Sequence, residues 1–132
     1  MTNGTPAGRP EAETAQAETA QAETARDEVF AALASPVRRD LLGLLREHGP
    51  MQVQELAAHF QMRRPSVSEH LKVLRDAELV DVQRSGRNSH YRLKAQTLVQ
   101  VSDWLSPYER FWREKLGRLS DLLDEEEDEP TP

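Results

Sequence analysis

The sequence predicts a mainly helical fold with one small β-hairpin, in the order helix, helix, short strand, helix, helix, strand, strand, helix. Three observations support this order. Residues 55–60 and 63–75 read as two short helices joined by a tight turn, residues 80–84 and 89–93 alternate apolar and polar side chains, and a long helical pattern follows. Two helices on a tight turn followed by a hairpin predict a winged helix-turn-helix.

The overall charge of −6 is distributed unevenly along the chain. Residues 1–24 hold one arginine and four glutamates, and residues 121–132 hold seven acids and no base. The stretch 25–120 therefore carries a charge of +4. A basic centre between acidic ends is compatible with binding to double-stranded DNA, although the chain as a whole is acidic.

Cysteine is absent from the chain. Its absence excludes disulfides, thiolate metal sites and cysteine nucleophiles, and it gives no sign of an oxidising compartment. No apolar run is long enough for a transmembrane helix or a signal peptide. We therefore expect a cytoplasmic protein with no membrane partner.

At 132 residues the chain predicts one domain with a tail at each end. Residues 1–26 continue from a Gly, Pro, Thr and Asn rich start into the repeats AETAQ, AETAQ and AETAR. A period of five draws no persistent apolar stripe around a helix, so we expect a disordered or frayed tail rather than a partner-binding coil. Residues 27–122 form the winged-helix domain, and residues 123–132 form an acidic disordered tail.

Two helices are predicted before the helix-turn-helix. An apolar face over residues 29–33 marks the first, and Ser35 then caps the second, with Pro36 at its first position. Gly49-Pro50 ends this second helix, and residues 51–53 could pair with the hairpin as a short strand. The apolar stripe of the second helix is Val37, Leu41, Leu44 and Leu45.

The helix over residues 63–75 is the centre of the predicted fold. Its residues Val67, Leu71 and Leu74 recur at i, i+4 and i+7, so they form a buried stripe, and Pro65 suits the first turn. The outer face mixes short donors with cations, which suits a helix that meets phosphates and base edges. This face consists of Arg64, Ser68, Glu69, Lys72 and Arg75.

The helix before it is expected to bury Leu56, Ala57 and Phe60. In the hairpin, Ser85-Gly86-Arg87-Asn88 forms the turn, because Gly and Asn tolerate positive φ. This basic tip can reach the DNA backbone or minor groove beside the helix in the major groove. The predicted DNA contacts are Arg63, Arg64, Ser66, Ser68, Glu69, His70, Lys72, Arg84, Arg87, Asn88 and Arg92.

The last helical pattern runs from Leu98 to Leu122 with apolar residues at alternating steps of three and four, interrupted by Lys115. Ser106-Pro107-Tyr108-Glu109 places a proline inside a capping-box pair, so we expect a kink or a division there. Because this helix is so apolar and lies at the end of a small domain, we expect its apolar face to be buried against a second subunit. The predicted homodimer interface is Val29, Phe30, Leu33, Leu98, Val101, Leu105, Tyr108 and Trp112.

From about Val29 to Leu93 the chain resembles the ArsR/SmtB family of bacterial winged-helix repressors. The resemblance implies a homodimer formed by the first and last helices. Such a dimer binds an imperfect inverted repeat in promoter DNA, usually as a repressor released by an effector. The stretches that carry the resemblance are Leu33-Ala34-Ser35-Pro36-Val37-Arg38-Arg39, Glu55-Leu56-Ala57, Pro65-Ser66-Val67-Ser68-Glu69-His70-Leu71-Lys72-Val73-Leu74, and Gly86-Arg87 with Tyr91-Arg92-Leu93.

The chain departs from the metal-sensing members of this family. Members that sense soft metals often carry a Cys-x-Cys pair just before the helix that starts at Glu55. This chain has Gln52 and Gln54 there, and carboxamides are poor ligands for such metals. We therefore predict no metal site and no cofactor. Members with the family's other metal site carry Asp and His at the start of the last helix, where this chain has Ala95 and Thr97. They carry His and Glu further along that helix, at positions near Tyr108 and Phe111 of this chain.

The family also usually has glycine in the turn before the DNA-reading helix and at the end of that helix. This chain has Gln61 and Glu78 at those positions. Because a side chain disfavours the positive φ that glycine adopts, we expect a shifted or slightly strained backbone there.

Other functions of the same residues are less economical. Ser66 and Ser68 have no base, orienting acid or oxyanion loop beside them, so no enzyme is predicted. The aromatic cluster Trp104, Tyr108, Phe111 and Trp112 favours a dimer core over a pocket for an apolar effector. Four histidines lie on separate predicted elements, which favours polar caps or phosphate neighbours over metal ligands. They are His48, His59, His70 and His90.

The sequence thus predicts a homodimeric, sequence-specific DNA-binding transcriptional regulator, and we expect it to act as a repressor. An activator, or a regulator whose signal is sensed by a separate partner protein, is the alternative that the missing effector ligands suggest, and the identity of any effector or partner protein stays open. A helical scaffold that recruits a partner through residues 98–122 is the alternative from another class. The basic hairpin tip has no purpose in that scheme.

Overall fold

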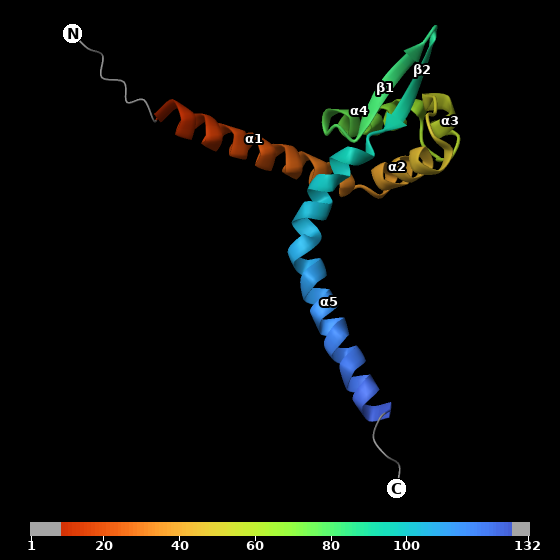
Figure 1. Cartoon of the computed structure of the whole chain (residues 1–132). Helices are drawn as coiled ribbons and strands as arrows, with labels where there is room; N and C mark the ends of the chain where they lie inside the picture. The colour runs from red at the N-terminus through yellow and green to blue at the C-terminus, as the bar shows by residue number, and fades with distance from the viewer. Residues whose placement is uncertain (1–8, 128–132) are drawn as a thin grey trace, which may run out of the picture. The chain divides into compact units, whose positions relative to one another are not determined.

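A computed structural model gives the fold of residues 9–127 and the side chains of residues 11–126. Along these residues the elements follow in the order α1, α2, α3, α4, β1, β2, a short 3₁₀ helix η1 and α5 (Figure 1). The chain divides into two units, of which the first ends at Leu98 and the second begins at Val99. The predicted order of helices and hairpin strands is confirmed, whereas the predicted short strand over residues 51–53 is only an isolated bridge at Met51. None of the helices in the described part is long and apolar enough to cross a bilayer.

Helix α1 (Arg9–Leu33) runs through the AETAQ repeats without a break. Ala, Glu and Gln are good helix formers, which explains a helix that has no apolar face in this region. Residues 11–25 are exposed throughout, whereas Val29 and Ala32 are only 1% and 0% exposed. The predicted N-terminal tail is therefore helical where it is described, and its first eight residues lie outside the described part.

Helix α2 (Pro36–His48) begins as predicted, because the Ser35 hydroxyl oxygen accepts a 3.3 Å hydrogen bond from the backbone N–H of Arg38. Its buried face differs from the predicted stripe, since Leu42 is buried and Leu44 is only half-buried. The helix contacts α1, α4 and β2, so it needs a wider buried face than one stripe provides. The buried residues of this helix are Leu41, Leu42 and Leu45.

Helix α3 (Val53–Ala57) starts two residues earlier and ends sooner than the predicted helix over 55–60. The carboxylate of Glu55 accepts a 3.2 Å hydrogen bond from the backbone N–H of the N-cap residue and so fixes this earlier start. Of the residues expected in the core, Leu56 is 0% exposed, whereas Ala57 and Phe60 are half-buried.

Helix α4 (Arg64–Asp76) has proline in its first turn, as predicted. Each residue of its predicted stripe is 0% exposed, which confirms that this stripe is the inner face and leaves the polar face outside. The preceding turn passes through Gln61 without a positive φ. The stripe consists of Val67, Leu71 and Leu74.

The end of α4 shows the strain that the missing glycine predicts. Glu78 has a φ of 60°, and its N–H donates to the carbonyl of Arg75 at 2.9 Å. The N–H of Leu79 donates to the carbonyl of Leu74, also at 2.9 Å. These two bonds form a Schellman motif with a non-glycine residue at its left-handed position. The Thr97 hydroxyl donates to the Glu78 carbonyl at 2.6 Å and closes the turn.

Strands β1 (Val80–Ser85) and β2 (Asn88–Leu93) form the predicted antiparallel hairpin. A two-residue turn joins them, in which Gly86 has a φ of 65° and the next residue has no positive φ. That combination is typical of a type II′ turn, whose twist matches that of the strands. Of the predicted short strand, Met51 alone pairs with the hairpin, through N–H···O bonds of 3.0 and 2.8 Å with Tyr91.

Helix α5 (Val99–Glu127) continues through Pro107 and is not divided there, contrary to one of the two predicted outcomes. Proline has no N–H to donate to the carbonyl of Asp103, four residues back. The Ser106 hydroxyl donates to that carbonyl at 3.0 Å instead, so Ser106 supports the helix rather than capping a new one. The segment predicted as an acidic disordered tail is helical as far as Glu127, and the remainder lies outside the described residues.

Candidate nucleic-acid interface

The helix-turn-helix consists of α3 and α4, which contact each other. Because the inner stripe of α4 is completely buried, the orientation of its polar face is fixed by the core. A further contact crosses the turn, where the Arg64 guanidinium donates a 2.8 Å hydrogen bond to the side-chain oxygen of Gln54. Of the predicted contacts in this region, Arg63, Arg64, Ser66, Glu69 and Lys72 are exposed, and Ser68 and His70 are half-buried.

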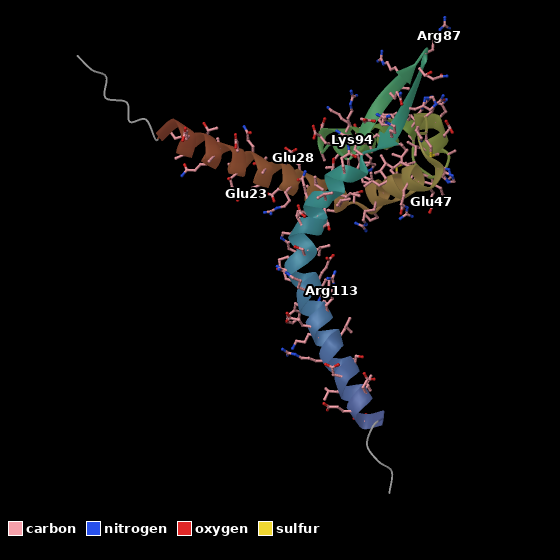
Figure 2. The ribbon with its side chains drawn as sticks, in the orientation of Figure 1. Glu23, Glu28, Glu47, Arg87, Lys94 and Arg113 are labelled. Atoms are coloured by element: carbon pink, nitrogen blue, oxygen red, sulfur yellow. The ribbon has the colours of Figure 1, made fainter. Side chains whose placement is uncertain are left out.

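The basic tip of the hairpin is fully accessible. Arg84, Arg87 and Asn88 are exposed, and Arg87 lies at the very end of the hairpin (Figure 2). Within the described residues, none of the side chains of Arg84, Arg87, Arg63 and Lys72 forms an ion pair. These four cations can therefore meet phosphates without first breaking an ion pair in the protein.

Arg92 is held differently from the other predicted contacts. It is paired across the hairpin with Asp81, and two N–H···O bonds of 3.0 Å join its guanidinium to the carboxylate. The hydrogen bond from Arg92 lowers the pKa of Asp81 below its usual value, and the same bond raises the pKa of Arg92. A contact between Arg92 and DNA would therefore share its guanidinium with Asp81.

His70 is also engaged inside the protein. Its Nδ1 lies 3.2 Å from a guanidinium nitrogen of Arg38, which is always a donor, so Nδ1 accepts and the ring proton is on Nε2. Arg38 also donates to the carbonyls of Ala32 at 2.6 Å and Ala31 at 3.1 Å, at the end of α1. Through Arg38, His70 thus connects α4 to the end of α1, and Nε2 is the ring nitrogen that remains for the predicted contact.

Three of these interactions were not predicted from the sequence, namely those made by Arg38, Gln54 and Asp81. The pairing of Asp81 with Arg92 could have been found, because a hairpin turn centred between Gly86 and Arg87 places these two residues opposite each other. The contacts of Arg38 and Gln54 join separate helices, and no local sequence pattern indicates them.

The predicted dimer residues differ widely in accessibility. Val29 is 1% exposed within a single chain, so it belongs to the core of its own unit and is not available to a partner. Phe30, Leu33, Leu98, Val101 and Leu105 are partly buried. Tyr108 and Trp112 on α5 are 48% and 51% exposed.

Two glutamines that hydrogen-bond to each other stand where metal-sensing members of the resembled family carry their cysteine pair. The side-chain amide of Gln54 donates to the side-chain oxygen of Gln52 and accepts from Arg64. Across residues 11–126, no three His, Asp or Glu side chains are grouped so that they could hold a metal ion. That metal does not regulate the protein stays a prediction.

Comparison with known proteins identifies the family. Residues 35–82 match the family described as "Bacterial regulatory protein, arsR family". The transcriptional repressor SdpR of Bacillus subtilis (strain 168) is 35% identical over 79 residues, which cover 60% of this chain and 87% of the relative. The HTH-type transcriptional regulator Rv2034 of Mycobacterium tuberculosis (strain ATCC 25618 / H37Rv) is 38% identical over 103 residues, which cover 78% of this chain and 92% of the relative. The chain belongs to the arsR family of bacterial regulatory proteins. It is a DNA-binding regulator of transcription.

Solved structures agree with this assignment to the arsR family. The crystal structure of the ArsR family transcriptional regulator RHA00566 superposes with a TM-score of 0.62 at 32% identity and covers 69% of this chain and 93% of its own. The solution structure of a homodimeric winged helix-turn-helix domain, Mb0332 from Mycobacterium bovis, has a TM-score of 0.51 at 23% identity, which supports the fold alone. The first structure leaves almost a third of this arsR-family chain unmatched.

Proposed function

We propose that this protein represses transcription by binding an imperfect inverted repeat in promoter DNA as a homodimer. In this proposal α4 enters the major groove, and the hairpin reaches the backbone or minor groove beside it. Repression is supported by the name of the similar SdpR protein, a transcriptional repressor. A DNA target also places the protein in the cytoplasm, and it requires no catalytic step.

The observation that carries the proposal is the combination of a buried inner stripe with an outer face of accessible cations. Val67, Leu71 and Leu74 hold α4 rigidly, while Arg64 in its first turn is exposed and Ser68 is half-buried. Rigid presentation lowers the entropy lost when side chains are ordered on DNA. We assign base-edge contacts to Arg64 and Ser68 and phosphate contacts to the cations of the hairpin.

The dimer follows from the size of this surface. One helix and one hairpin bury too little area to select a single promoter, so two copies must be held about 34 Å apart to meet successive major grooves. The part of α5 before residue 113 supplies exposed apolar surface for this purpose. We call the seam formed by Leu98, Val101, Leu105, Tyr108 and Trp112 the proximal seam.

The test is titration of the purified protein into labelled DNA from the region upstream of its own gene and into a scrambled fragment of the same length. We expect preferential binding of the upstream fragment and a linear decrease of log affinity with log salt concentration. Each phosphate contact contributes about −0.9 to that slope. Equal affinity for both fragments at every salt concentration would refute sequence-specific binding.

A further inference from the structure

The distal part of α5, beyond Trp112, carries an apolar face that the DNA-binding proposal does not use. Leu116, Leu119, Leu122 and Leu123 are 65%, 53%, 58% and 52% exposed. Their spacing of three and four residues places them on one face of the helix. A continuous apolar face of this size on an exposed helix indicates a partner.

Two polar residues interrupt this face at matching positions. Lys115 comes four residues before Leu119, and Glu126 comes four residues after Leu122. We call the line formed by Lys115, Leu119, Leu122 and Glu126 the distal seam. Along the helix its residues are a cation, two leucines and an anion, at steps of four, three and four. Read in the opposite direction the same line begins with the anion and ends with the cation, so an antiparallel copy presents the opposite charge at each end.

We propose that the distal seam binds the distal seam of a second copy in antiparallel orientation and thereby joins two dimers into a tetramer. Antiparallel pairing that places Leu119 opposite Leu122 also places Lys115 opposite Glu126 of the second copy. Two-fold symmetry makes each of these contacts twice. Both polar interruptions of the seam then face an opposite charge, and the leucines form the centre.

The flanking residues agree with the same register. Arg118 lies opposite Glu125 of the second copy, and Leu116 lies opposite Leu123 of the second copy. More broadly, residues 110–118 contain four bases and one acid, whereas residues 121–126 contain four acids and no base. Antiparallel pairing brings these oppositely charged segments together, and pairing of unlike charges favours one orientation over the other.

Parallel pairing gives the opposite result. In a parallel, in-register pair each seam residue faces its own copy, so Lys115 would face Lys115 and Glu126 would face Glu126. Like charges at a seam are unfavourable and act against that orientation. The charge pattern therefore selects the antiparallel pair.

This interface cannot replace the proximal seam along the same pair of helices. The centre of the antiparallel overlap lies between Leu119 and Leu122, about 23 Å along the axis from Leu105 at 1.5 Å per residue. The two Leu105 side chains of such a pair would lie about 46 Å apart along the axis. The proximal seams therefore remain free to form the proposed homodimer, and a chain with two separate interfaces assembles beyond a dimer. A tetramer would bind two operators cooperatively, so this inference extends the proposed function and rests on it.

The test is sedimentation of the full chain and of charge variants at equal concentration. We expect wild type at four times the chain mass of 15.0 kDa, and Lys115→Glu at twice that mass, because this variant faces Glu126 with a like charge. The double variant Lys115→Glu/Glu126→Lys inverts both charges and should return to four chains. Arg113, which Figure 2 labels on α5, lies two residues before Lys115 and therefore on nearly the opposite side of the helix, so Arg113→Glu makes the same change of charge and should remain at four chains.

Several outcomes overturn the proposal. Wild type that stays at two chains at every concentration would do so. A second contradicting result combines two variants: the double variant remains at two chains, and Glu126→Lys alone strengthens assembly. This result would show that the distal seam binds an acidic segment such as α1 rather than a second α5.

Leucine variants separate this proposal from the proposed function. Leu119→Glu should reduce the mass by half while each dimer keeps its affinity for a single operator, whereas Leu105→Glu should abolish operator binding. Loss of single-operator binding by Leu119→Glu would show that the distal seam is the dimer interface itself and would overturn the tetramer. Absence of sequence-specific binding in every variant would instead refute the proposed function.

Discussion

Replacement of Glu78 by glycine should stabilise the protein. Glu78 has a φ of 60°, a conformation that costs a residue with a side chain about 1 to 2 kcal/mol relative to glycine. About 0.5 to 1 kcal/mol of this gain is offset, because glycine makes the unfolded chain more flexible and so loses more conformational entropy on folding. The hydrogen bonds of the turn, including the one from Thr97, involve only the backbone of residue 78 and remain. The midpoints of these two ranges leave a net gain of about 0.75 kcal/mol in the free energy of unfolding.

This gain corresponds to an increase of about 2 to 8 °C in Tm for a domain of this size. Thermal unfolding followed by circular dichroism at fixed protein concentration measures it, since Tm of an oligomer depends on concentration. Glu78→Gln is the control for charge and should leave Tm unchanged. Asp76→Gly is the control for glycine at an ordinary helical position and should lower the free energy of unfolding by about 0.5 to 1 kcal/mol. A Glu78→Gly protein no more stable than wild type would show that this turn stores no strain.

The other predictions concern DNA, pH, metal and assembly. Arg64→Ala should cost about 1 to 3 kcal/mol on the operator and relax the preference at one base pair, whereas Arg87→Ala should weaken operator and random DNA alike; equal, negligible effects of both would contradict these assignments. Asp81→Asn should strengthen binding to both DNAs by releasing Arg92. Because the folded pKa of Asp81 is lowered, the wild-type ion pair stabilises the hairpin above the ordinary carboxyl pKa of 3.8 and is lost as pH falls through the lowered value. The variant should lack this part of the acid dependence, and an identical acid unfolding profile would argue against it. Calorimetric titration with zinc and nickel should show at most weak binding, and a tight stoichiometric site that changes operator affinity would disprove the metal-free prediction. Leu105→Glu places an unpaired charge in the proximal seam and should cost several kcal/mol of dimer stability, leaving only weak, salt-sensitive binding to any DNA; a variant with unchanged mass and affinity would place the dimer interface elsewhere.

Most of the fold could be predicted because its signals are local. The stripe of α4, the cap at Ser35 and the turn at Gly86 each depend on residues within one or two helical turns or on a single turn type. The strain at Glu78 was also predictable, since a resemblance to a family with glycine there identifies the residue that must adopt a positive φ.

Where the structure differs from the sequence-based predictions, the cause is a physical one that no local sequence pattern reveals. Leu42 replaces Leu44 in the core because α2 is covered by three neighbouring elements, and periodicity describes only one face. Val29 was assigned to a dimer, yet it is buried within its own unit, because an apolar residue on a helix does not indicate which chain covers it. Of the two outcomes expected at the proline of α5, a kink or a division, the division is wrong, because the Ser106 hydroxyl donates to the Asp103 carbonyl that Pro107 cannot reach with an N–H.

The glutamines that stand where metal-sensing members carry cysteines have a structural role of their own. Gln54 accepts a hydrogen bond from Arg64, which we assign to a base edge, and Gln52 in turn accepts from Gln54. In this chain a side chain of α3 therefore contacts Arg64 directly, the residue for which we propose a base-edge contact. Displacement of the Gln54 amide would therefore remove the hydrogen bond that holds the Arg64 guanidinium.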